Sequence, residues 1–121
     1  MKFDRFNTKL RSTIETKQDA EMAFDMYAGP NSESIQLHEE AIFEITANEP
    51  SKFPELNALY AAFYSDPLVS DQAAGRLVHE LIEVLDVTRS SNRVVFDLAA
   101  RLLPFFRHAF RNKEQVRCSS D

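Results

Sequence analysis

The chain has 121 residues, 44% of them hydrophobic, and a formal net charge of −5. One domain of this length buries enough apolar surface to fold without disulfides or a structural metal. Only two glycines occur, which disfavours a turn-rich sandwich or barrel, and no apolar run approaches the roughly 18 residues of a membrane span.

Apolar residues recur at steps of three and four along most of the chain, which is the spacing of one helix face. Six helices are predicted in this way, and their stripes are, in chain order, Phe3, Phe6, Leu10 and Ile14; Met22, Ala23, Met26 and Tyr27; Ile35, His38, Ile42 and Ile45; Leu56, Leu59, Tyr60 and Phe63; Leu77, Val78, Leu81, Ile82 and Leu85; Val94, Val95, Leu98, Leu102, Phe106 and Phe110.

Helix-starting and helix-ending residues separate these stripes. The breaks are Gly29-Pro30 before an N-cap at Ser32, Asn48 and Pro50 before Ser51 and Pro54, Ser65-Asp66-Pro67 before a cap at Ser70 or Asp66, and Arg89-Ser90-Ser91-Asn92. Pro104 lies inside the last stripe, and a kink or split is expected there because proline clashes with the preceding turn.

These patterns predict an all-α fold, a single compact bundle of about six antiparallel helices with possible solenoid-like helix pairs. The expected domain covers 1–112, with a flexible tail over 113–121. Cys118 lies in that tail and is expected to be an exposed, incidental thiol, with a redox or intermolecular role as the alternative. The expected core comprises Phe6, Leu10, Ile42, Leu59, Phe63, Leu81, Leu85, Leu98 and Leu102.

The charges are segregated along the chain. Residues 1–18 carry five basic and two acidic side chains (+3), residues 19–86 carry two and 14 (−12), and residues 87–121 carry seven and three (+4). An acidic middle repels nucleic-acid phosphates and attracts a basic protein. The same acids also suit simple solvation of helix surfaces. Contact with RNA stays open through the C-terminal basic residues Arg101, Arg107, Arg111, Lys113 and Arg117.

No motif of a metal site or an enzyme is found. The stretches at His38 and His79 lack the Glu-x-x-His spacing of di-iron bundles and the second histidine of His-Glu-x-x-His proteases. The chain has no Gly-x-Ser-x-Gly and no glycine-rich phosphate loop. We therefore expect no cofactor, no metal and no catalytic activity.

The segment over 53–66, FPELNALYAAFYSD, combines a Phe-Pro-x-Leu start, an aromatic pair and a following Asp. In these features it resembles small acidic helical immunity proteins of bacterial contact-dependent growth inhibition systems. The Trp or Gly usual after the Asp in that family is missing, and Pro67-Leu68-Val69 follows instead. The resemblance implies a protein that neutralises a cognate toxin, often a nuclease, inside the producing cell.

We therefore expect a cytoplasmic protein whose acidic helical surface binds a basic toxin domain, with neither nucleic acid nor membrane as partner. The alternative is a helical adaptor or regulatory subunit that uses an exposed apolar patch. Candidate binding residues are carboxylates chosen mostly because they avoid the apolar stripes, together with two tyrosines as anchors: Glu39, Glu40, Glu44, Tyr60, Tyr64, Asp66, Asp71, Glu80 and Glu83.

Overall fold

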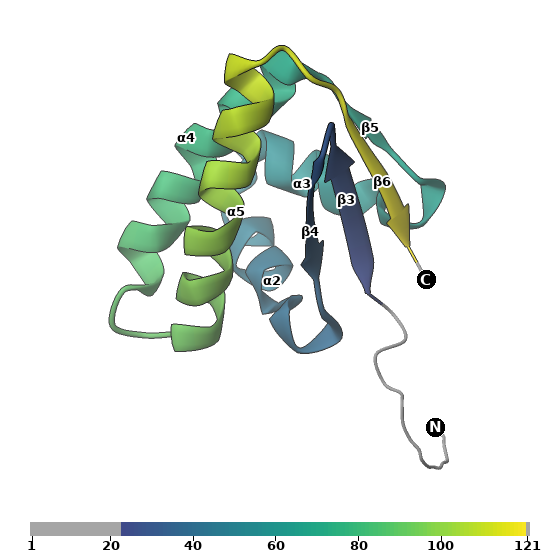
Figure 1. Cartoon of the computed structure of the whole chain (residues 1–121). Helices are drawn as coiled ribbons and strands as arrows, with labels where there is room; N and C mark the ends of the chain where they lie inside the picture. Colours follow the sequence, from purple (N-terminus) through teal and green to yellow (C-terminus); the bar gives the residue numbers. More distant parts are fainter. Residues whose placement is uncertain (1–22, 121) are drawn as a thin grey trace.

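A computed structural model describes residues 23–120 and contains both helices and a sheet, with the helices on one face of that sheet (Figure 1). The strands are β3 (Phe24–Ala28), β4 (Asn31–Ile35), β5 (Leu68–Val69) and β6 (Val116–Ser120). The α-helices are α2 (Ala41–Ala47), α3 (Pro54–Ala61), α4 (Asp71–Thr88) and α5 (Arg93–Arg111), and the 3₁₀ turns are η2 (Leu37–Glu39) and η3 (Phe63–Ser65). The prediction of an all-α bundle was wrong, because the fold is mixed α/β.

The four strands lie in the order β4-β3-β6-β5, and all neighbours are antiparallel. A two-residue turn, Gly29-Pro30, joins β3 to β4 and places Ala28 opposite Asn31. Gly29 has a φ of 58°. A positive φ at the first turn residue, followed by the negative φ that proline imposes, fits the type II′ turn that suits a twisted hairpin. The turn that we read as a helix end is therefore a hairpin.

The helix predicted from Met22, Ala23, Met26 and Tyr27 was wrong, because residues 24–28 form strand β3. Phe24, Met26 and Ala28 are buried while the residues between them are not, which is the period-two burial of a strand with one covered face. A helix of five residues has too few internal hydrogen bonds to be stable by itself. As a strand, the same segment is paired with β4 on one side and β6 on the other.

The C-terminal segment that we expected to be a flexible tail forms β6, an inner strand of the sheet. Val116 and Cys118 point into the core, so Cys118 is a buried thiol and not the exposed one predicted. Burial, together with the nearby charge of Asp66, raises the pKa of Cys118 to about 12. The domain therefore extends through Ser120, eight residues beyond the predicted limit at 112.

The later helices match the prediction more closely. The Ser70 side chain accepts a hydrogen bond from the Ala73 backbone N–H at 3.0 Å and caps α4, and Asn92 caps α5 through the Val95 N–H at 3.1 Å. Helix α5 runs without a split through Pro104. The predicted third helix is only partly present, because its first residues belong to β4 and its remainder to η2 and α2. No described helix has the length and apolar character needed to cross a membrane.

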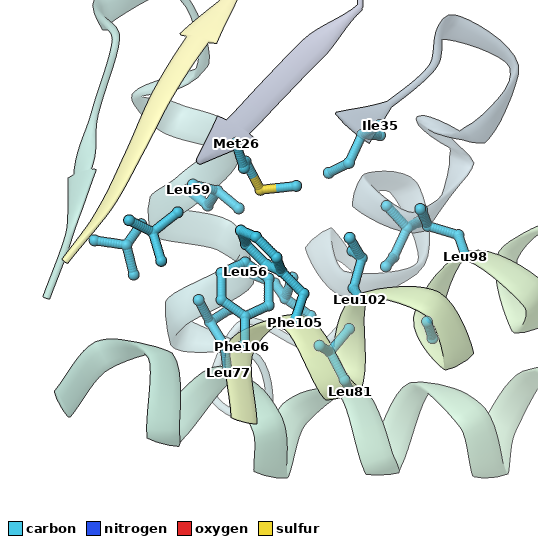
Figure 2. Close-up of a cluster of buried hydrophobic side chains, with 14 of the residues drawn as sticks. Met26, Ile35, Leu56, Leu59, Leu77, Leu81, Leu98, Leu102, Phe105 and Phe106 are labelled. Carbon is cyan, nitrogen blue, oxygen red and sulfur yellow. The ribbon is translucent and has the colours of Figure 1, made fainter. Parts of the chain in front are cut away.

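The core lies between the sheet and the helices, and side chains from β3, β4, α3, α4 and α5 meet there (Figure 2). Helices α4 and α5 make the most extensive contact between any two elements, and they lie side by side in Figure 1. Six of the predicted core residues are buried, namely Ile42, Leu59, Phe63, Leu81, Leu98 and Leu102. Leu85 is half-buried and packs against them, whereas Phe6 and Leu10 lie outside the described residues.

Candidate protein-binding surface

Beyond Glu55 in its first turn, α3 carries no charge, and neither does the turn η3 that follows it. Residues 56–65 contain no Asp, Glu, Lys or Arg, although such residues form 27% of the chain. Leu56, Leu59 and Phe63 turn inward, and the outward positions hold small and aromatic residues. We call the exposed set Ala58, Tyr60, Ala61 and Tyr64 the tyrosine face. Tyr60 is 48% and Tyr64 67% exposed, so both rings offer area to a partner.

Buried aromatic rings hold both tyrosines in place. Tyr60 stacks on Phe43 of α2 with ring centroids 4.6 Å apart, and Tyr64 meets Phe63 edge to face at 5.1 Å. Phe63 in turn stacks on Phe24 of β3 at 4.3 Å. Because these contacts already restrict the two tyrosine rings, the rings lose less side-chain entropy when a partner packs on them. Sequence reasoning selected Tyr60 and Tyr64 but did not predict this support.

An apolar groove of about 160 Å³ lies beside the tyrosine face, between α3, β5 and the start of α4. Its lining is apolar except for one carboxylate, and consists of Glu55, Ala58, Leu59, Ala62, Pro67, Leu68, Val69, Ala73 and Leu77. Leu68 is 63% exposed at its edge. This groove was not predicted from the sequence. The signal available was the uncharged run over 56–65.

Three of the predicted carboxylates lie on elements that adjoin this surface. Glu44 follows Phe43 on α2, Asp66 follows η3, and Asp71 lies in the first turn of α4. None of the three forms an ion pair with a described residue, although Asp66 accepts a 3.3 Å hydrogen bond from the Ser120 N–H. Their charges are therefore not neutralised within the described part of the chain.

Glu39 was predicted to be an exposed binding residue, and that prediction was wrong. It is buried and accepts hydrogen bonds from both terminal nitrogens of Arg101, at 3.0 and 3.1 Å, and from the Gln36 N–H at 2.9 Å. Burial raises the pKa of Glu39. The hydrogen bonds from Arg101 and Gln36, together with the Arg101 charge, lower it by more, so the pKa lies below the usual value. Glu39 therefore ties η2 to α5.

Glu80 is also buried, against the prediction, and caps α3 from a distance. Its two oxygens accept the backbone N–H groups of Glu55 at 2.8 Å and Leu56 at 2.9 Å. The N-cap position of α3 holds Phe53, which has no side-chain acceptor, so Glu80 satisfies N–H groups that would otherwise be unpaired. Burial raises the pKa of Glu80 more than these two hydrogen bonds lower it.

The remaining two predicted carboxylates are half-buried. Glu83 lies 3.4 Å from Lys52, which also pairs with Glu49, so its charge is partly neutralised. One oxygen of Glu40, Oε2, is inaccessible and has no hydrogen-bond partner among the described residues, and burial raises the pKa of this carboxyl. The structure thus does not gather the nine predicted residues into one face. Tyr60, Tyr64, Glu44 and Asp66 are exposed and Asp71 is half-buried, and the three carboxylates lie on elements that adjoin the tyrosine face.

The basic residues that kept RNA contact open are also divided. Arg101 is held by Glu33, Glu39 and the Ser34 carbonyl, and Arg117 lies over the Tyr27 ring on the face of the sheet away from the helices. Arg107 and Arg111 are exposed and line a hollow at the end of α5. Positive charges in the last turns of a helix are expected because they offset its dipole.

Within residues 23–120, no three His, Cys, Asp or Glu side chains are arranged to hold a metal ion. No protein-family model, curated protein or solved structure matches the chain. The resemblance of the segment over 53–66 to immunity proteins therefore stays a prediction. The candidate surface is defined here by its own chemistry, an uncharged aromatic face with adjoining carboxylates.

Proposed function

We propose that the chain is a cytoplasmic inhibitor, an immunity protein, that binds a basic toxin domain through the tyrosine face. The observation that carries this proposal is the uncharged surface over residues 56–65 of α3 and η3. Tyr60 and Tyr64 are exposed there, held by buried rings, and adjoined by Glu44, Asp66 and Asp71. Binding hot spots favour tyrosine, and the core of an interface is depleted in charge.

The two parts of this surface have different roles in the proposal. The tyrosines bury apolar area against the partner and slow its dissociation. The carboxylates attract a basic partner from a distance and orient it, which raises the association rate at low salt. Because Glu39 and Glu80 are committed to internal hydrogen bonds, their side chains are not part of the proposed contact.

The resemblance to immunity proteins falls on this same part of the fold. Its Phe-Pro start is the beginning of α3, its aromatic pair is Phe63 and Tyr64 of η3, and its Asp is Asp66. The residues that suggested toxin neutralisation are thus the ones that build the exposed surface. This coincidence supports the inhibitor over a general adaptor, although both would bind protein.

The experiment is a protection assay. The chain is co-produced in bacteria with the protein encoded beside its gene, and growth is measured. We expect the unchanged chain to restore growth and the double variant Tyr60→Ser, Tyr64→Ser to fail. A matched control is Val94→Ser, which removes an apolar side chain of similar exposure, 44%, from the start of α5. Each variant is first checked for its cooperative unfolding transition.

Charge is tested separately by reversing Glu44, Asp66 and Asp71 to Lys. We expect association of the purified pair to slow on the order of ten-fold or more at low salt, and the difference to shrink as salt rises. An association rate that changes neither with salt nor with the charge reversals would favour the adaptor. A double tyrosine variant that protects fully would remove the tyrosine face from the proposal.

A further inference from the structure

The groove beside the tyrosine face is open because its walls are alanines. Leu59 and Leu77, which are buried, line part of it, and the small side chains of Ala58, Ala62 and Ala73 line other parts that larger residues would fill. Its volume of about 160 Å³ is close to that of an apolar protein cavity of about 150 Å³ that accepts benzene. One phenylalanine ring or leucine side chain from outside therefore fits.

The charges around the groove are acidic. Glu55 lines it and pairs with Arg76 at 2.6 Å, and Asp66 and Asp71 flank the short stretch that supplies Pro67, Leu68 and Val69. Asp66 and Asp71 have no ion pair with a described residue. The segment that borders the groove thus carries two carboxylates without an ion pair, and their charge favours a positively charged partner segment.

We propose that this groove is an anchor pocket, which binds one aromatic or large aliphatic side chain from a lysine- or arginine-rich segment of a protein partner. This inference rests on the proposed function, because the segment that enters the pocket belongs to the proposed basic partner. The pocket and the tyrosine face share Ala58, so one partner segment can occupy the pocket while adjoining residues pack on Tyr60 and Tyr64.

The probes are three synthetic peptides that separate the two parts of this chemistry. They are Gly-Lys-Lys-Phe-Lys-Lys-Gly, the same peptide with Gly in place of Phe, and Gly-Glu-Glu-Phe-Glu-Glu-Gly. Each is titrated into the full-length ¹⁵N-labelled chain while the backbone amide signals are followed by NMR. We expect the Lys-Phe peptide to shift the amides of Ala58, Ala62 and Ala73, with at least about ten-fold tighter binding than either other peptide.

Two alanine substitutions provide a matched pair. Ala58→Leu fills the groove, whereas Ala100→Leu adds the same side chain to an exposed position of α5, outside both the groove and the tyrosine face. Both positions are helical and exposed, so both variants should fold. We expect Ala58→Leu to weaken binding of the Lys-Phe peptide on the order of ten-fold and Ala100→Leu to change it less than about two-fold.

Equal binding of the Lys-Phe and Lys-Gly peptides, or equal effects of the two alanine variants, would overturn the inference. So would peptide binding that occurs only after Phe3 and Phe6 are changed to Ser, since the chain's own N-terminal residues would then be the occupant. Growth protection that depends on the tyrosines but not on Ala58 would reject the pocket and leave the proposed function intact. Peptide binding without any protection would reject the proposed function alone.

Discussion

Arg101 and Glu39 lie 62 residues apart in sequence and meet in a two-point salt bridge, with N···O distances of 3.0 and 3.1 Å. The same guanidinium donates to Glu33 at 2.9 Å and to the Ser34 carbonyl at 2.8 Å. One side chain of α5 therefore joins the edge strand β4, the turn η2 and the helix layer. Arginine suits this role because its planar fork matches a carboxylate at two points.

Arg101→Ala should destabilise the fold, because it leaves the buried carboxylate of Glu39 without its cation. Breaking a fully buried pair costs about 3–5 kcal/mol, and the partial exposure of Arg101 reduces our expectation to roughly 2–3 kcal/mol. Urea unfolding measures the change. Arg107→Ala is the control, because Arg107 is exposed and forms no ion pair with a described residue, and it should stay within about 0.5 kcal/mol. Similar losses in both variants would contradict the role assigned to Arg101.

The stabilisation that Glu39 supplies should depend on pH. The pKa of Glu39 is lowered in the folded state from 4.5, so its contribution is fully present above that value and is lost as pH falls through the folded pKa. The free energy of unfolding of the unchanged chain should therefore exceed that of Glu39→Gln at pH 7, and the gap should narrow below about pH 4.5. Urea titrations from pH 3 to 7 test this. A constant gap would reject the assignment.

The Cys118 thiol should be inert in the folded chain. It is buried, and its pKa of about 12 leaves almost no thiolate near neutral pH. A thiol-specific colour reagent at pH 8 should react more than about 100-fold faster after unfolding in urea. The control is Cys118→Ser with Ser119→Cys, which moves the thiol to the exposed neighbour on the other face of β6. Equal reactivity of the two folded proteins would mean that β6 does not bury this side chain.

The helices after residue 50 were predictable because their signals are local. Ser70 and Asn92 cap their helices with their own side chains, and the loop over 89–92 separates two strong stripes. The strands were not predictable in this way. β3 is stabilised by pairing with β6, whose residues lie about 90 positions later in the chain, and no local pattern identifies that partner.

The candidate site residues show the same difference between local signals and contacts made by distant residues. Tyr60 and Tyr64 were selected because tyrosine is favoured at binding hot spots, and both are exposed, although Tyr60 had also been assigned to the apolar stripe of its helix. Glu39 and Glu80 also lay off the apolar stripes, yet each satisfies polar groups of another element. A hint existed for Glu80, because a helix that begins with Phe53 and Pro54 lacks an N-cap acceptor and needs one from elsewhere.

The close approach of α4 and α5 leads to the final prediction. A Cβ added to Gly75 of α4 would lie 2.6 Å from Cδ1 of the Phe110 ring on α5, so the ring must shift before alanine fits. Alanine in place of glycine inside a helix otherwise stabilises it by about 0.5–1 kcal/mol. In a Phe110→Ala background we expect Gly75→Ala to give that full gain.

With Phe110 present, the same substitution should be less favourable by about 1 kcal/mol, because the half-exposed ring loses its packing as it moves. Urea unfolding of the unchanged chain, both single variants and the double variant gives the coupling directly. An equal effect of Gly75→Ala in both backgrounds would mean that the ring does not rest on the glycine. A large coupling would show that the Phe110 ring occupies the space that a side chain at position 75 would need, so that glycine there allows α4 and α5 to pack closely.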